Sequence, residues 1–179
     1  MYGLIAIFDE KTEQTIKHIW KELKEKSISS YAYEVENRRP HITLASYNDI
    51  NKTEFINKMD EFYKDKPTID IMFNSIGSFL NSGALFFSPI VTRELLEFHS
   101  NHHKYFKQFN NDPTSLYLPN NWIPHCTLAN RLFPNKLSEA FNYCSLRSSN
   151  IYGKIKEIAL IEASNKNKVT ITYLKELLE

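Results

Sequence analysis

Two copies of one short stretch carry the polar side chains whose spacing suggests chemistry. The sequence reads Pro-His-Ile-Thr-Leu-Ala at residues 40–45 and Pro-His-Cys-Thr-Leu-Ala at residues 124–129, so only the residue after the histidine differs. The two copies lie almost half of the 179-residue chain apart. A polar pair that occurs once in each half indicates a single site assembled from two related parts of the chain.

The repeated histidines and threonines share a face if each copy forms a β-strand. Successive side chains of a strand point to opposite faces, so residues i and i+2 lie together. His41 and Thr43 would then point to the same side, and so would His125 and Thr127. Core packing would preserve the apolar residues of a repeat rather than its histidine and threonine. The pattern therefore predicts a functional site.

Two imidazoles and two hydroxyls suit attack on a phosphodiester without a metal ion. A neutral imidazole removes a proton from the nucleophile, and a protonated one donates to the leaving oxygen. Histidine can do both near neutral pH because its ordinary pKa is about 6.5. The hydroxyls can donate to the non-bridging phosphate oxygens. We expect His41 and His125 to be catalytic, Thr43 and Thr127 to bind phosphate, and no cofactor or metal to take part.

Three further polar residues follow the same alternation. Arg39 and Tyr47 keep the parity of His41, and Arg131 keeps that of His125. If the strands are regular, these side chains lie at the rim of the site formed by the histidines and threonines, where they would bind phosphate or a base. A β-bulge or a strand end would cancel this prediction.

Three aromatic residues outside the two motifs are candidates for a wall on which a base stacks. These are Trp122 and the adjacent pair Phe86 and Phe87. Stacking on such side chains is a common way to hold an unpaired base. We expect at least one of them to pack in the core instead.

Other reactive residues support a site less well. His99, His102 and His103 have i, i+3 and i+4 spacing on a predicted helix, which could hold a metal, but no carboxylate or cysteine pattern accompanies them. We expect surface or partly buried histidines. Cys126 follows His125, but strand alternation directs it to the opposite face, so it is not expected to act as a nucleophile.

Composition limits the class of protein. Four glycines leave no glycine-rich nucleotide loop, and a net charge of +1 favours a small nucleotide or an RNA end over a long nucleic acid. Two cysteines, no signal peptide and no long apolar run predict a cytoplasmic protein without a membrane segment. We expect a monomer whose residues 1–179 form one domain.

Hydrophobic periodicity predicts alternating strands and helices. The predicted strands are 2–8, 31–35, 39–47, 68–73, 76–79, 84–88, 122–130, 154–163 and 169–173, with a turn at 165–167 between the last two. The predicted helices are 12–26, 54–63 (capped by Thr53), 92–109 (capped by Thr92) and 136–146. This irregular alternation with hairpins indicates an α+β fold with mostly antiparallel sheets.

The paired Pro-His-x-Thr-Leu-Ala strands resemble the 2H phosphoesterase superfamily, named for two His-x-Ser/Thr motifs. Bacterial 2′-5′ RNA ligases and cyclic phosphodiesterases are its best-known members. The N-terminal strand and helix, the motif separation and the closing hairpin extend the resemblance to nearly the whole chain. It implies a bilobal fold, in which two pseudo-symmetric sheets with flanking helices enclose a central cleft.

The resemblance implies hydrolysis of nucleoside 2′,3′-cyclic phosphates or related cyclic or 2′,5′-linked phosphodiesters. It assigns His125 to the attacking water and His41 to the leaving 3′-oxygen. The choice among these substrates, and between hydrolysis and ligation, stays open. Two other hypotheses are a module that binds nucleotides or RNA ends without turnover, and a metal-dependent protein that uses the helix histidines.

Overall fold

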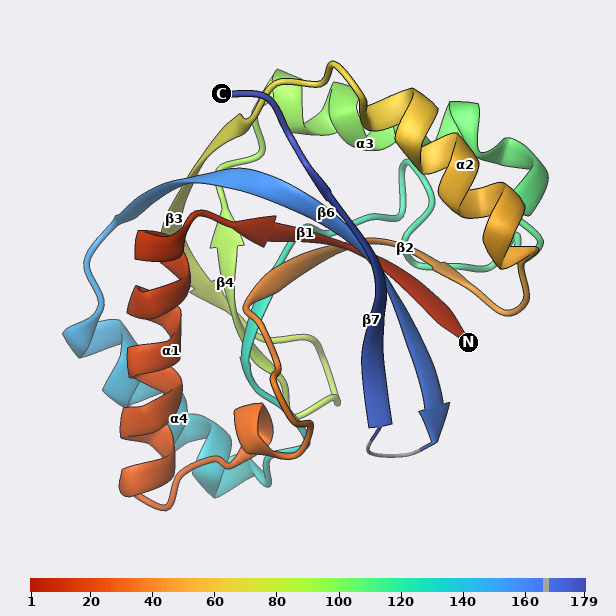
Figure 1. Ribbon diagram of the computed structural model, residues 1–179. Coiled ribbons are helices and arrows are strands. Elements are labelled where there is room, and N and C mark those ends of the chain that lie inside the picture. Colours follow the sequence, from red (N-terminus) through yellow and green to blue (C-terminus); the bar gives the residue numbers. More distant parts are fainter. Residues whose placement is uncertain (166–167) are drawn as a thin grey trace.

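The computed structural model describes residues 1–165 and 168–179, and within them the chain forms a strongly curved sheet with helices at its two ends (Figure 1). The strands of these ranges are β1 (Tyr2–Phe8), β2 (His41–Tyr47), β3 (Ile69–Gly77), β4 (Leu85–Pro89), β5 (Cys126–Ala129), β6 (Ile151–Asn165) and β7 (Lys168–Glu176). The helices are α1 (Glu10–Glu25), α2 (Lys52–Tyr63), α3 (Arg93–Tyr105) and α4 (Pro134–Arg147), with short 3-10 helices η1 (Tyr31–Tyr33) and η2 (Lys107–Phe109).

The strands pair antiparallel in the order β2-β1-β6-β3-β4-β5, and β7 pairs with β6 outside this path. Strand β6 joins the parts of the sheet because its first residues pair with β3 and its later residues pair with β1 and β7. The predicted α+β class with antiparallel strands is therefore confirmed. The expected division into two sheets differs, because hydrogen bonds connect all seven strands of the described residues into one sheet.

Strands β2 and β5, which carry the two copies of the motif, are the first and last in this order, yet they contact each other. The sheet therefore curls until its two ends meet. An edge strand normally leaves a row of backbone groups unpaired. Here, side chains from other segments form hydrogen bonds with some of these backbone groups. The contact between the two edge strands brings both copies of the motif into one region.

The helices form two pairs at opposite ends of the sheet, α1 with α4 and α2 with α3 (Figure 1). Side-chain caps fix where they begin. Asp9 caps α1, which therefore starts two residues before the predicted position. Thr92 caps α3 as predicted, whereas Asn51 rather than Thr53 caps α2. Among residues 1–165 and 168–179, no helix is both long and apolar enough to cross a membrane.

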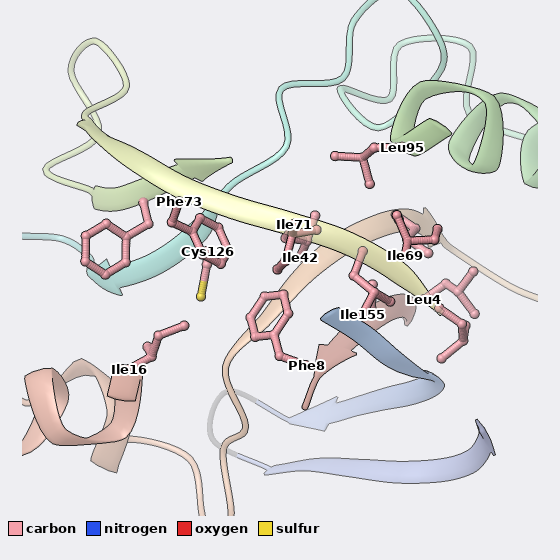
Figure 2. Close-up of a cluster of buried hydrophobic side chains, with 14 of the residues drawn as sticks. Leu4, Phe8, Ile16, Ile42, Ile69, Ile71, Phe73, Leu95, Cys126 and Ile155 are labelled. Carbon is pink, nitrogen blue, oxygen red and sulfur yellow. The ribbon is translucent and has the colours of Figure 1, made fainter. Parts of the chain in front are cut away.

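The core lies on the face of the motif strands opposite the histidines. Ile42 and Cys126, which alternate with the motif histidines and threonines, are fully buried. Burial raises the pKa of the Cys126 thiol to about 12, which rules out a thiolate nucleophile near neutral pH. Figure 2 shows both side chains inside a cluster drawn from several strands and helices, and its labelled members are Leu4, Phe8, Ile16, Ile42, Ile69, Ile71, Phe73, Leu95, Cys126 and Ile155.

The strand predicted at residues 31–35 is wrong, and the one predicted at residues 122–130 is longer than the strand observed. Residues 31–35 contain a 3-10 turn, because the Ser29 hydroxyl accepts a hydrogen bond from the Tyr31 N–H and the Tyr31 ring packs edge-on against Trp20. The second motif strand is short, since only Cys126–Ala129 pair with β4. The predicted turn at 165–167 includes residues 166–167, which lie outside the described residues.

Candidate active site

The two motif histidines are held in the same way. The Nδ1 atom of His41 lies 2.7 Å from the Arg39 carbonyl oxygen, and that of His125 lies 2.7 Å from the Ile123 carbonyl oxygen. In each copy, the accepting carbonyl stands two residues before the histidine, across the proline. A carbonyl can only accept, so Nδ1 carries the proton in both rings. Each neutral imidazole then keeps Nε2 as the free proton acceptor.

Burial lowers the pKa of both histidines, but to different degrees. Burial is the main cause that lowers the pKa of His41 to about 4. The hydrogen bond to the Arg39 carbonyl opposes it in part, and the Arg38 cation and the His125 ring lower the pKa further by smaller amounts. Burial also lowers the pKa of His125. Because β2 and β5 contact each other, the two imidazoles are close enough for His125 to affect the pKa of His41. His41 is neutral across the physiological pH range.

Two tryptophans hold the motif threonines in a crossed arrangement. The Trp20 indole N–H, from α1 in the first half, donates to the Thr127 carbonyl oxygen of the second motif at 3.1 Å. The Trp122 indole N–H, from the second half, donates to the Thr43 carbonyl oxygen of the first motif at 2.8 Å. Each motif strand is therefore fixed by the half of the chain to which it does not belong.

Two tyrosines follow the same crossed pattern around the threonine side chains. Tyr31 lies close enough to Thr127 for a side-chain hydrogen bond that opposes the rise in its pKa caused by burial. Tyr117 has the same relation to Thr43. A phenol beside each threonine hydroxyl adds a second polar group to each side of the site.

Two adjacent arginines precede the first motif and differ in their partners. Arg39, which we predicted to bind phosphate, forms ion pairs with Glu13 of α1 and with Glu157 of β6, both with N–O distances of 2.5 Å. Its charge is compensated by protein. Arg38 has no carboxylate partner among the described residues; its guanidinium stacks on Tyr31 at 4.0 Å, and its buried Nε atom has no hydrogen-bond partner. Arg38 is therefore the cation available to a bound anion.

The expected position of Tyr47 at the cleft rim is wrong. Strand β2 contains a bulge, because Ile5 pairs with Thr43 while Leu4 pairs with Ala45, so one extra residue reverses the alternation. Tyr47 consequently points into the core, where it is 1% exposed. Its hydroxyl lies 2.7 Å from Nε2 of His102, so it is occupied inside the protein.

Arg131 and Trp122 differ from their predicted positions for local reasons. Arg131 follows the end of β5 and has a left-handed backbone with a φ of 57°, so strand parity does not extend to it. Its exposed guanidinium forms an ion pair with Glu34. Trp122 is half-buried and stacks on His99 at 3.8 Å, besides its hydrogen bond to Thr43, so one face of its ring is covered by the protein.

An aromatic wall does lie beside His125, but only one of its residues was predicted. The Phe86 and Phe79 ring centres lie 5.1 and 4.8 Å from that of His125, and the two phenyl rings also contact each other. Phe86 fits closely over Gly77, where an added Cβ would come within 2.6 Å of the ring. Phe87 points to the other face and packs in the core.

The three helix histidines are buried behind the first motif, more completely than predicted. His99 and His103 each place Nε2 3.1 Å from the Leu44 carbonyl oxygen. His102 lies between two tyrosine hydroxyls, 2.7 Å from Tyr47 and 2.8 Å from Tyr63. Nε2 of His99 also lies 2.8 Å from the Tyr117 carbonyl oxygen, whereas Nδ1 of His103 is buried without a hydrogen-bond partner. The three rings therefore hydrogen-bond mainly with β2 and the core. No cluster of three or more His, Cys, Asp or Glu residues placed to hold a metal occurs within residues 1–165 and 168–179.

Sequence patterns gave little sign of several residues around the site. Arg38 lies outside the strand, so no alternation connects it with His41. Phe79 belongs to the segment after β3, and Trp20 appeared only as one member of an apolar helix face. Their pairing with the motifs depends on contacts between distant segments. The one available signal was that Arg38 lies directly before Arg39, next to the first copy of the motif.

The fold is similar to that of several solved structures, one of which is a phosphoesterase. Three solved structures are similar to the chain: E. coli LigT in apo form (12% identity, TM-score 0.64, 99% of this chain and 97% of LigT), a phosphoesterase (14%, 0.60, 99% and 98%) and the TT0787 protein of Thermus thermophilus (14%, 0.60, 98% and 97%). At this identity they show a common fold. No curated protein sequence matches.

The chain belongs to the 2′-5′ RNA ligase superfamily, whose family model matches residues 8–167. Membership supports an enzyme that breaks or joins phosphodiester bonds.

Proposed function

We propose that this protein hydrolyses nucleoside 2′,3′-cyclic phosphates, or related cyclic or 2′,5′-linked phosphodiesters, by acid–base catalysis between His41 and His125 without a metal ion. The observation that carries the proposal is the shared orientation of the two rings. Both donate Nδ1–H to a backbone carbonyl and so present Nε2 to one site. E. coli LigT, with the same fold, has been crystallised with 3′-AMP, which supports a nucleotide ligand.

For a 2′,3′-cyclic phosphate, the reaction can be written with each proton placed. Water attacks phosphorus while a neutral imidazole takes its proton at Nε2, and the bond from phosphorus to the 3′-oxygen breaks. The other imidazole, protonated at Nε2, donates to that oxygen and leaves a nucleoside 2′-phosphate. The Thr43 and Thr127 hydroxyls and the Arg38 guanidinium would hold the non-bridging oxygens.

The electrostatics favour His41 as the base and His125 as the acid, opposite to the assignment that the family resemblance implies. Burial and, to a smaller extent, the Arg38 cation lower the pKa of His41 to about 4, so hardly any of it carries the second proton near neutral pH and it is present as the base. The neighbours of His125 are aromatic, and no cation lowers its pKa further. A bound phosphate anion raises the pKa of a nearby imidazole and would favour its protonated form.

An assay with a nucleoside 2′,3′-cyclic phosphate in excess chelator tests this function. We expect turnover with chelator and a loss of at least about a hundredfold in His41→Ala and in His125→Ala, measured separately. His18→Ala is the matched control, because His18 is exposed on α1. Binding without turnover in the wild type would instead support a nucleotide-binding module. Activity lost with chelator would contradict the metal-free mechanism.

A further inference from the structure

At the bulge in β2, side chains of other segments bind two successive backbone carbonyls of the first motif. Ile5 pairs with Thr43 and Leu4 pairs with Ala45, so Leu44 is the extra residue that the bulge leaves unpaired. In a regular strand, successive carbonyls point to opposite edges. Here the carbonyl oxygens of Thr43 and Leu44 both accept hydrogen bonds from side chains outside the sheet. The position of the first motif therefore depends on those donors.

Three aromatic N–H groups supply these hydrogen bonds. The Trp122 indole N–H donates to the Thr43 carbonyl oxygen at 2.8 Å. The Nε2 atoms of His99 and His103, one turn apart on α3, each lie 3.1 Å from the Leu44 carbonyl oxygen. A carbonyl can only accept, so both imidazoles carry their proton on Nε2. The donors thus come from α3 and from the segment that leads to the second motif.

His99 also contacts that segment directly. Its Nε2 atom lies 2.8 Å from the Tyr117 carbonyl oxygen, so one N–H group lies between carbonyls of two different segments. Its ring stacks on Trp122, with the ring centres 3.8 Å apart and the planes 1° apart. Burial lowers the pKa of His99 to about 4, so the ring is neutral at physiological pH. His99 therefore joins α3, β2 and the segment before His125.

Residues 112–122, which lie within the described part of the chain, form no helix or strand. In that described part, only Tyr117 and Trp122 of this segment form hydrogen bonds with residues outside it. The Tyr117 carbonyl contacts His99, and its hydroxyl lies close enough to Thr43 for a side-chain hydrogen bond. Trp122 likewise contacts both His99 and Thr43. Both residues therefore connect His99 with Thr43.

We propose that His99 is a positioning residue for the reaction, because it holds Tyr117 and Trp122 where they fix the hydroxyl and the carbonyl of Thr43. His99 acts through these two residues and does not touch the reacting atoms. The inference rests on the proposed function for the role of the Thr43 hydroxyl at the phosphate. The hydrogen bonds of His99 themselves do not depend on that function.

Two substitutions separate the hydrogen bonds of His99 from its stacking. His99→Phe keeps a ring against Trp122 but removes the N–H, whereas His99→Gln keeps an amide N–H near the position of Nε2. The Thr43 hydroxyl acts where charge develops in the transition state. We therefore expect His99→Phe to lower kcat for a nucleoside 2′,3′-cyclic phosphate about tenfold, with KM within about threefold. His99→Gln should keep kcat within about threefold of the wild type.

A double mutant with Thr43→Val shows whether His99 acts through Thr43. In that background His99→Phe should lower kcat by less than about twofold, because the hydroxyl that it positions is already absent. His102→Phe is the matched control on α3, since its ring contacts the hydroxyls of Tyr47 and Tyr63. It should lower stability and leave kcat near the wild-type value. Equal losses in both backgrounds, or equal losses in His99→Phe and His99→Gln, overturn the inference.

Amide hydrogen exchange separates a failure of this inference from a failure of the proposed function. His99→Phe should speed exchange in residues 112–122, because the Tyr117 carbonyl loses its donor from α3. His102→Phe should leave this exchange at the wild-type rate, and thermal unfolding shows that each variant is folded. Unchanged exchange in His99→Phe overturns the role of His99 whatever the turnover. Faster exchange, combined with no turnover by the wild type, would refute the proposed catalysis and still support His99 as the residue that holds this segment.

Discussion

The two copies of the motif share the same reactive groups but differ in what surrounds them. Both histidines donate Nδ1–H to a carbonyl two residues earlier, and both threonine carbonyls accept from a tryptophan of the other half. Around the first copy, however, there are a cation and a buried cluster of imidazoles. Around the second there are two phenyl rings and a short strand.

This difference explains how a repeat can supply unlike partners. Acid–base catalysis needs one group that accepts a proton and one that donates it, and two histidines in identical surroundings would have identical affinities for the proton. The sequence repeat provides the imidazoles, and the neighbours separate their roles. Burial, assisted by Arg38, keeps His41 neutral, whereas no cation opposes protonation of His125.

A substrate whose leaving group needs no proton gives the strongest test of the different roles of His41 and His125. On a phosphodiester with a p-nitrophenyl leaving group, His125→Ala should keep most of the wild-type rate, because the acid is no longer needed. His41→Ala should lose about a hundredfold or more, because water still requires a base. Initial rates of p-nitrophenol release measure both. The opposite result would restore the assignment implied by the family resemblance.

The adjacent arginines offer a smaller and more specific test. Arg38→Gln removes a cation next to His41, so the pKa of His41 should rise by a small amount, because burial still lowers it. The acidic limb of kcat/KM should move to higher pH accordingly. We also expect about a tenfold loss in kcat/KM, as for a charge-assisted hydrogen bond. The pH–rate profile from pH 3.5 to 8 gives both values.

Arg39→Gln is the matched variant of the preceding residue. It removes the ion pairs of Arg39 with Glu157 and with the buried Glu13, although Glu13 keeps Lys17 as a partner at 3.0 Å. We therefore expect the free energy of unfolding to fall by about 2 kcal/mol while the acidic limb stays in place. Denaturant unfolding measures the stability change. Identical pH–rate shifts in the two variants would show that Arg38 has no special relation to His41.

The smallest expected effect is on stability and concerns His102, one of the buried histidines of α3 that pack behind the first motif. His102→Phe removes the partner of the Tyr47 and Tyr63 hydroxyls, and we expect about 1–3 kcal/mol less stability at pH 7.5. Burial lowers the pKa of His102 well below 6.5 in the folded protein, so the unfolded chain binds more protons between these values. Its stabilising effect is therefore complete above pH 6.5 and is lost as the pH falls below it.

Denaturant unfolding at pH 7.5 and pH 5 measures this dependence. The wild type should lose stability toward pH 5 by roughly 1.4 kcal/mol per pH unit for each such buried histidine, and His102→Phe should lose less. His18→Phe, at an exposed position, should follow the wild type. An unchanged pH slope in His102→Phe would mean that His102 is not kept neutral by folding.

Local periodicity predicted most strands, the four helices and the shared face of His41 and Thr43, since these depend on neighbours in sequence. It failed where long-range packing decides. The bulge in β2 reversed Tyr47, and the carboxylates of α1 and β6 neutralised Arg39. Both changes arise from segments far away in the chain. Arg38 was missed for the same reason. It is available to an anion because no carboxylate of the described residues pairs with it, and this depends on segments far away in the chain.

The crossed indole hydrogen bonds give the protein an optical property. Its two tryptophans, the only ones in the sequence, each donate to the carbonyl of a motif threonine. Indole emission changes in wavelength and intensity when the hydrogen bond or polarity at its N–H changes. Intrinsic fluorescence should therefore report on each half of the site without a label, and Trp20→Phe and Trp122→Phe would separate the two signals.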